Sequence, residues 1–184
     1  MPRFNPDKAT DAVALLVKLA GGRLNKVAAI KLLYFAERES LATTGITITD
    51  STFYSIQRGP VSSEILALMD THTACGRWPE YLRTVDYNVE LVKPPRIEEL
   101  SRYHITLIRK HWRVHRESFA PTDFPQAIVD YSNTLGEWKD PGPGARIPIT
   151  LRDMLEAQHL PTDTIDAIIT SNQQLPEWID CNRN

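Results

Sequence analysis

Apolar residues recur at helical spacing over the first part of the chain. A helix is predicted to begin at Asn5, whose side chain can cap a first turn that contains Pro6, and to end at Gly21-Gly22. A second helix, from about Asn25 to Leu41, has an apolar face wide enough for the interior of a bundle. The chain is therefore expected to start with two packed helices.

Strand-like segments follow these helices. Residues 52–58 are rich in β-branched and aromatic side chains and predict a strand, and residues 46–49 predict a short strand or an extended lead-in. Gly59-Pro60 is expected to end the strand at a sharp corner that leads directly into a helix from Val61 to Met69. A second strand, Tyr87 to Val92, is expected to pair with the first.

The rest of the chain is again mostly helical. Residues 96–118 form the longest helical pattern, with apolar stripes on two sides, which predicts the central helix. Asp123 and Gln126 predict a capping box for a helix over 124–135. Beyond the Pro/Gly-rich connector 139–148, Thr150 and Asp153 open a short helix, and 163–171 is predicted to form the last one.

These patterns predict a mainly α (α+β) fold. We expect a compact bundle of about six or seven helices with a small two- or three-stranded antiparallel sheet, built on residues 53–58 and 89–92. Residues 1–184 are expected to form a single domain: a body over about 7–155, a C-terminal helical extension over 150–172, and a loose tail over 173–184.

Composition narrows the classes of protein. The 21 basic and 23 acidic residues give a formal charge of −2, which argues against nucleic acid as the default partner. Cys75 and Cys181 have neither zinc-site spacing nor the density of a disulfide scaffold. The most apolar N-terminal stretch, Ala12 to Ala20, contains Lys18 and is too short to span a bilayer. We therefore expect a cytoplasmic protein with no membrane partner.

A search for catalytic and metal-binding patterns finds little. His111 and His115 lie four positions apart on a helix and could share a metal ion, but Trp112 stands where a zincin has a carboxylate, so a structural or solvated pair is favoured. There is no nucleophile elbow, phosphate loop or dinucleotide fingerprint. The sequence thus predicts a non-enzymatic protein without cofactor or metal, unless the fold assembles distant residues.

The helix over 96–118 is rich in basic residues. This helix has six basic and three acidic residues, and Tyr103 and Trp112 lie between them in the sequence. This pattern has two interpretations. In one, the helix is a docking surface for an acidic protein or a nucleic acid. In the other, it is a solvated face whose arginine side chains cover core aromatic residues with their aliphatic parts. Because the whole chain is mildly acidic, we favour an acidic protein over nucleic acid as the partner of this helix.

Three segments resemble a known family. The run Lys31–Arg38 reads KLLYFAER, the run Phe53–Val61 ends in GPV, and Leu135–Pro141 reads LGEWKDP. Together they resemble the SocA-like, or Panacea, antitoxin domain, with the similarity covering roughly 7–155. Asn133 stands where relatives commonly have a histidine. The structural motif residues are Lys31, Leu32, Leu33, Tyr34, Phe35, Gly59, Pro60, Val61 and Trp138.

The resemblance implies a non-enzymatic antitoxin that neutralises a co-encoded toxin by direct binding. Relatives are common in phages and prophages and pair with unrelated toxins, including nucleotide-transferring, synthetase-like ones and small membrane-active ones. One relative is similar to a proteolytic adaptor, which implies a AAA+ protease as an alternative partner. A nucleic-acid-binding regulator that uses the helix over 96–118 is the other alternative.

Candidate contact residues follow from the interface preference for tyrosine and arginine. On the strand, Tyr54 and Arg58 are expected to be exposed, together with Phe53, because we place this strand at a sheet edge. On the long helix we expect contacts from Arg102, Arg109, Arg113 and Arg116.

Overall fold

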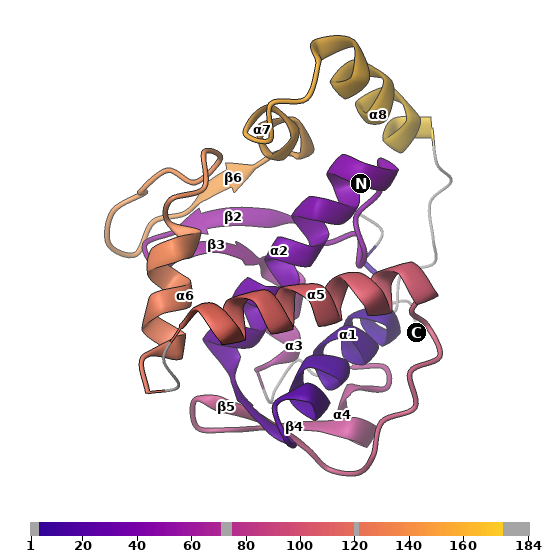
Figure 1. The fold of residues 1–184 in the computed structure, drawn as a ribbon, viewed down its shortest axis with the longest axis vertical. Helices are drawn as coiled ribbons and strands as arrows, with labels where there is room; N and C mark the ends of the chain where they lie inside the picture. The colour runs from indigo at the N-terminus through magenta and orange to yellow at the C-terminus, as the bar shows by residue number, and fades with distance from the viewer. Residues whose placement is uncertain (1–3, 71–74, 120–121, 175–184) are drawn as a thin grey trace.

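The computed structural model describes residues 4–70, 75–119 and 122–174, which form eight helices and two three-stranded antiparallel sheets (Figure 1). The helices are α1 (Pro6–Leu19), α2 (Lys26–Thr44), α3 (Ser63–Leu68), α4 (Trp78–Tyr81), α5 (Arg102–Ser118), α6 (Phe124–Ser132), α7 (Leu151–Glu156) and α8 (Thr162–Gln174). The strands are β1 (Arg23–Asn25), β2 (Phe53–Ile56), β3 (Gly59–Ser62), β4 (Leu82–Val85), β5 (Asn88–Leu91) and β6 (Ile147–Ile149). The predicted mainly helical α+β class is confirmed.

The first two helices begin at capping asparagines, the first of them at the predicted cap Asn5. The Asn5 side chain accepts hydrogen bonds from the backbone N–H groups of Asp7 and Lys8, and Asn25 caps α2 in the same way. α2 ends at Gly45, which adopts a left-handed conformation at φ 78°. These local signals place the two first helices where the sequence predicts them.

α2 occupies the centre of the fold, a place that the sequence pattern assigned to the helix over 96–118. α2 packs against α1, α5, α6 and α7, whereas α5 keeps one face exposed. α5 also begins only at Arg102, because the Asp11 carboxylate accepts hydrogen bonds from the backbone N–H groups of Glu98 and Glu99 and holds this lead-in outside the helix. The prediction of a central helix starting at 96 was wrong.

The two predicted strands lie in different sheets. β2 is the middle strand of the sheet β3-β2-β6, while β5 is the middle strand of β1-β5-β4. Gly59, at φ 90°, turns the chain into a hairpin, so that Val61 pairs with Tyr54 and the helix starts only at Ser63. The expectations of one shared sheet and of a direct strand-to-helix corner at Gly59-Pro60 were therefore wrong.

Other local expectations had mixed outcomes. The Asp123 side chain makes no capping hydrogen bond, and α6 ends at Ser132. The Thr150–Asp153 capping box is present at the start of α7. Residues 46–49 form no strand, because the buried Glu37 carboxylate holds the backbone N–H groups of Ile48 and Thr49. The predicted loose tail begins inside α8, and its part over 175–184 lies outside the described residues.

One buried apolar cluster runs from Ala9 in α1 to Ile165 in α8. The α7–α8 pair lies at one end of the molecule, beside the end of α2 (Figure 1). There the side-chain amide of Asn172 donates a 2.7 Å hydrogen bond to the carbonyl oxygen of Gly45. Within the described ranges, no helix is long and apolar enough to cross a membrane.

Candidate functional site

The KLLYFAER and LGEWKDP segments meet in the interior. The Glu137 carboxylate, whose side chain is fully buried, accepts hydrogen bonds from the Tyr34 hydroxyl at 3.0 Å and from Arg38 Nε at 2.6 Å. Burial, followed by the negative charge of Glu137, holds the pKa of Tyr34 well above its usual value. These polar groups satisfy one another, so the junction binds α2 to the segment after α6.

The same segment also fastens the hairpin. The Trp138 indole N–H donates to the carbonyl oxygen of Ile56 at 3.0 Å, and the backbone N–H of Lys139 donates to the Ser55 hydroxyl at 3.2 Å. The apolar motif residues lie in the core with at most a few per cent of their surface exposed: Leu32, Leu33, Tyr34, Phe35 and Val61. Tyr34, Glu137 and Trp138 therefore join α2, the hairpin and the LGEWKDP segment in one packed junction.

Lys31 is an ionisable residue within this junction. Its side chain is buried, and Nζ donates a 2.7 Å hydrogen bond to the carbonyl oxygen of Pro60. Burial and, second, the positive charge of Arg58 lower the pKa of Lys31 to about 7. Sequence reasoning counted Lys31 only as a motif residue, although a lysine between Ile30 and Leu32 on an apolar helix already signals a buried amine.

The hairpin places the predicted strand residues in three different environments. Phe53 is buried, so the expectation of an exposed Phe53 was wrong; β2 is a middle strand with neighbours on both sides. Tyr54 is half-buried, and the Arg146 guanidinium lies 4.7 Å from its ring centroid. Arg58 is exposed at the hairpin turn. The sequence analysis missed Arg146 because its contact with Tyr54 depends on the pairing of β6 with β2.

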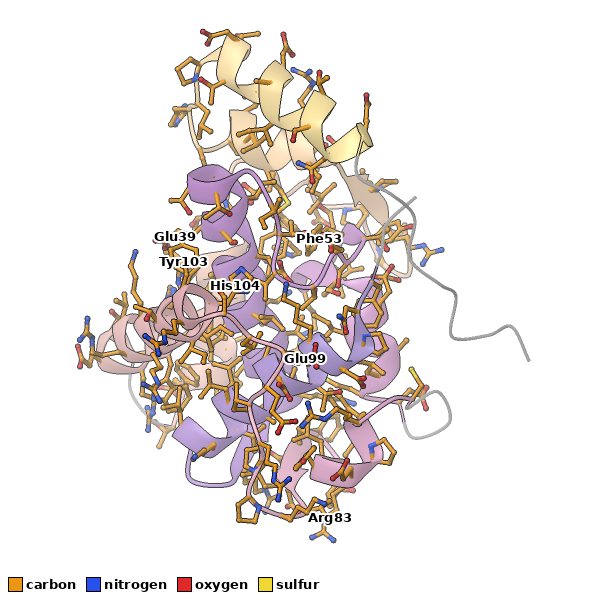
Figure 2. The ribbon with its side chains drawn as sticks, turned by 90° about the vertical axis from the view of Figure 1, so that its right-hand side faces the viewer. Glu39, Phe53, Arg83, Glu99, Tyr103 and His104 are labelled. Carbon is orange, nitrogen blue, oxygen red and sulfur yellow. The ribbon has the colours of Figure 1, made fainter. Side chains whose placement is uncertain are left out.

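α5 carries an exposed arginine row, which we define as Arg102, Arg109 and Arg113. These residues are spaced by seven and four positions, so they share one side of the helix, and within the described chain none of them has an ion pair. Lys110, by contrast, pairs with Glu39 at 2.6 Å. Figure 2 looks along α5 at the edge of the molecule, where the Tyr103 hydroxyl lies 2.5 Å from Thr43 Oγ1 of α2 and the buried His104 is turned toward the body.

The remaining predicted arginine differs from this row. Arg116 is half-buried, and its guanidinium lies 5.4 Å from the ring centroid of Phe124. Trp112 packs edge-on against the same phenylalanine at 6.2 Å. The structure therefore brings Arg116 into the α5–α6 contact and leaves the arginine row open to solvent.

Two of the three histidines of α5, His111 and His115, are packed into an aromatic cluster. His115 lies 4.6 Å from the Phe35 ring and 5.8 Å from the His111 ring, measured between centroids, and His111 Nε2 lies 2.9 Å from a Glu39 carboxylate oxygen. Burial, with His111 as the second cause, lowers the pKa of His115 to about 4. Among the residues that the structure describes, no three potential ligands are grouped to hold a metal ion.

Comparison with known proteins gives one match. A family model described as "Antitoxin SocA-like, Panacea domain" matches residues 30–139, which is more than half of the chain. The match contains Lys31, Tyr34 and Glu137 of the junction together with the whole of α5. Neither the curated proteins nor the solved structures contain a match to this chain.

Proposed function

Since the chain belongs to the SocA-like antitoxin family with the Panacea domain, we propose that it neutralises a co-encoded protein toxin by binding it directly. The family match is the observation that carries this proposal. The buried junction supports a non-enzymatic role, because Tyr34, Arg38 and Glu137 form hydrogen bonds with one another and these groups are therefore not free to act on a substrate. We therefore propose a non-enzymatic antitoxin that acts by occupying its partner.

We propose that the arginine row of α5 is the principal contact surface. Three exposed guanidinium groups, which have no ion pair among the described residues, are available for carboxylates of a partner, and arginine binds carboxylates through two parallel hydrogen bonds. Long-range attraction between this row and an acidic toxin surface also speeds association. Tyr54 and Arg58 of the hairpin and Arg116 at the α5–α6 contact complete the proposed set of contact residues.

Two alternative functions are also consistent with the arginine row. A nucleic-acid-binding regulator would use it to contact phosphates, and its affinity would then fall steeply with salt concentration. A proteolytic adaptor would present the bound partner to a AAA+ protease. The proposed toxin is a protein, and a nucleotide-transferring, synthetase-like enzyme is one class that fits the family.

The experiment is co-expression with the neighbouring reading frame. We expect the neighbouring protein alone to arrest growth, this chain to restore growth, and the purified pair to form a stable complex with the toxin intact. Loss of toxin only in cells with an active AAA+ protease would favour the adaptor. Tight, salt-sensitive binding to duplex DNA, with no effect on a growth-arresting neighbour, would overturn the antitoxin proposal.

A further inference from the structure

Lys31 and Arg58 lie near the hairpin turn, and no carboxylate of the described residues pairs with either of them. Lys31 is buried, and Arg58 is close enough for its charge to lower the pKa of Lys31. Within residues 4–70, 75–119 and 122–174, neither side chain has an ion pair. A buried ammonium without a counter-charge is costly, so this corner of the fold is electrostatically unsatisfied.

Hydrogen-bond donors at this corner are also unused. An ammonium group donates three hydrogen bonds, but in the described chain Lys31 Nζ makes one, to the carbonyl oxygen of Pro60. Asn133 accepts a 3.4 Å hydrogen bond from Ser132 through Oδ1, while its amide nitrogen has no partner among the described residues. Ammonium, guanidinium and amide donors are therefore available together.

Gly59 lets these groups approach one another. A Cβ atom at Gly59 would lie 2.7 Å from Asn133 Oδ1 and 2.9 Å from Lys31 Nζ, and it would also collide with the Ser132 hydroxyl. Lys31 and Asn133 thus converge on the backbone of the residue next to Arg58. Arg58 is exposed and Asn133 half-buried, so both can meet a ligand, while Lys31 lies behind them and acts through its charge.

We propose that Arg58, Asn133 and Lys31 form a binding site for a carboxylate group of the protein partner. The carboxylate would accept hydrogen bonds from Arg58 and Asn133 and place a negative charge near the Lys31 ammonium, which compensates its burial. The source is an Asp or Glu side chain of the partner or its C-terminus. This inference rests on the proposed function, because it takes the ligand from a bound protein.

The site can be tested without the toxin by thermal unfolding in sodium acetate and in sodium chloride of equal ionic strength. We expect acetate to raise the melting temperature of the wild-type protein above its value in chloride, and Lys31→Met and Arg58→Gln to lose this increment. Arg83→Gln is the matched control, since Arg83 is an exposed arginine that pairs with Glu90 in the other sheet. Equal increments in all four proteins, or an increment with inorganic phosphate but not acetate, would overturn the proposal.

Affinity for the toxin gives the second readout. Arg58→Gln lies at an exposed turn and should fold normally, and we expect it to weaken toxin binding at least about tenfold, with Arg83→Gln unchanged. If wild-type protein binds and neutralises the toxin but Arg58→Gln binds equally well, the carboxylate site is refuted and the antitoxin function stands. If wild-type protein does not bind the toxin, the proposed function fails, and the acetate experiment decides on the site by itself.

Discussion

Arg38 and Glu137 are 99 positions apart in the sequence, and Arg38 Nε lies 2.6 Å from a Glu137 carboxylate oxygen. Glu137 also receives the Tyr34 hydroxyl, and a second Arg38 nitrogen donates to the carbonyl oxygen of Ala157 at 3.3 Å. One guanidinium thus links α2 to the segment after α6 and to the end of α7. Arg38 therefore holds the segment after α6 and the end of α7 against the central helix α2.

Replacing Glu137 should destabilise the fold strongly. Glu137→Gln keeps the size of the side chain but leaves Arg38 without its counter-charge in the interior, and removal of one partner from a buried pair costs about 3–5 kcal/mol. The free energy of unfolding in urea measures this loss. Asp166→Asn, which breaks the exposed pair with Arg152, is the control and should cost less than about 1 kcal/mol. Similar losses in both variants would contradict the assigned role.

Gly59 should be required for folding. Gly59→Ala combines a left-handed backbone with a Cβ that meets Lys31, Ser132 and Asn133. Gly142→Ala is the matched control, because Gly142 also has a positive φ, 78°, but open space around it, and its cost should be about 1–2 kcal/mol. Thermal unfolding should show a clearly larger loss for Gly59→Ala, with binding lost in parallel. A Gly59→Ala protein of wild-type stability that fails to bind would instead place this glycine in the interface.

The arginine row should matter for binding and not for stability. The double variant Arg109→Ala/Arg113→Ala removes two exposed guanidinium groups that form no ion pair within the described part of the chain. We therefore expect the melting temperature to stay unchanged and toxin affinity to fall at least about tenfold.

A charge-matched control for this variant is Arg23→Ala/Arg83→Ala, which removes two arginines that pair with Glu90 in the sheet β1-β5-β4. Calorimetric titration with the toxin should show wild-type affinity for this control. If the α5 double variant also binds and rescues like wild type, α5 presents a solvated face and the interface lies elsewhere.

Acid should destabilise the protein through its buried histidines. Burial lowers the pKa of His115 to about 4 in the folded state, against an ordinary value of 6.5. At His115 the folded protein therefore binds fewer protons than the unfolded chain between these values, so the stability that His115 contributes is present above pH 6.5 and is lost as pH falls toward 4. His115→Phe keeps an aromatic ring in the cluster, and its melting temperature should fall less between pH 7 and pH 4.5. An unchanged acid sensitivity would contradict this account.

Short-range signals in the sequence predicted the features that act over a few residues. Asn5, Asn25 and Thr150 lie at the starts of helices because an N-cap needs only neighbouring backbone N–H groups. The helical period located α1, α2 and α8 to within a few residues. The motif segments indicated the family, since their spacing along the chain is itself a sequence property.

Tertiary structure alone decided the strand partners, the central helix and the candidate site. A strand completes its hydrogen bonds with whichever edge the packed helices bring close, so β2 pairs with β6 and β1 pairs with β5. α5 keeps one face exposed because α2, and not α5, occupies the centre of the fold. Lys31, Arg58 and Asn133 are spread over three segments, and only the hairpin turn at Gly59 brings them together, because electrostatic and steric contacts depend on distance in space.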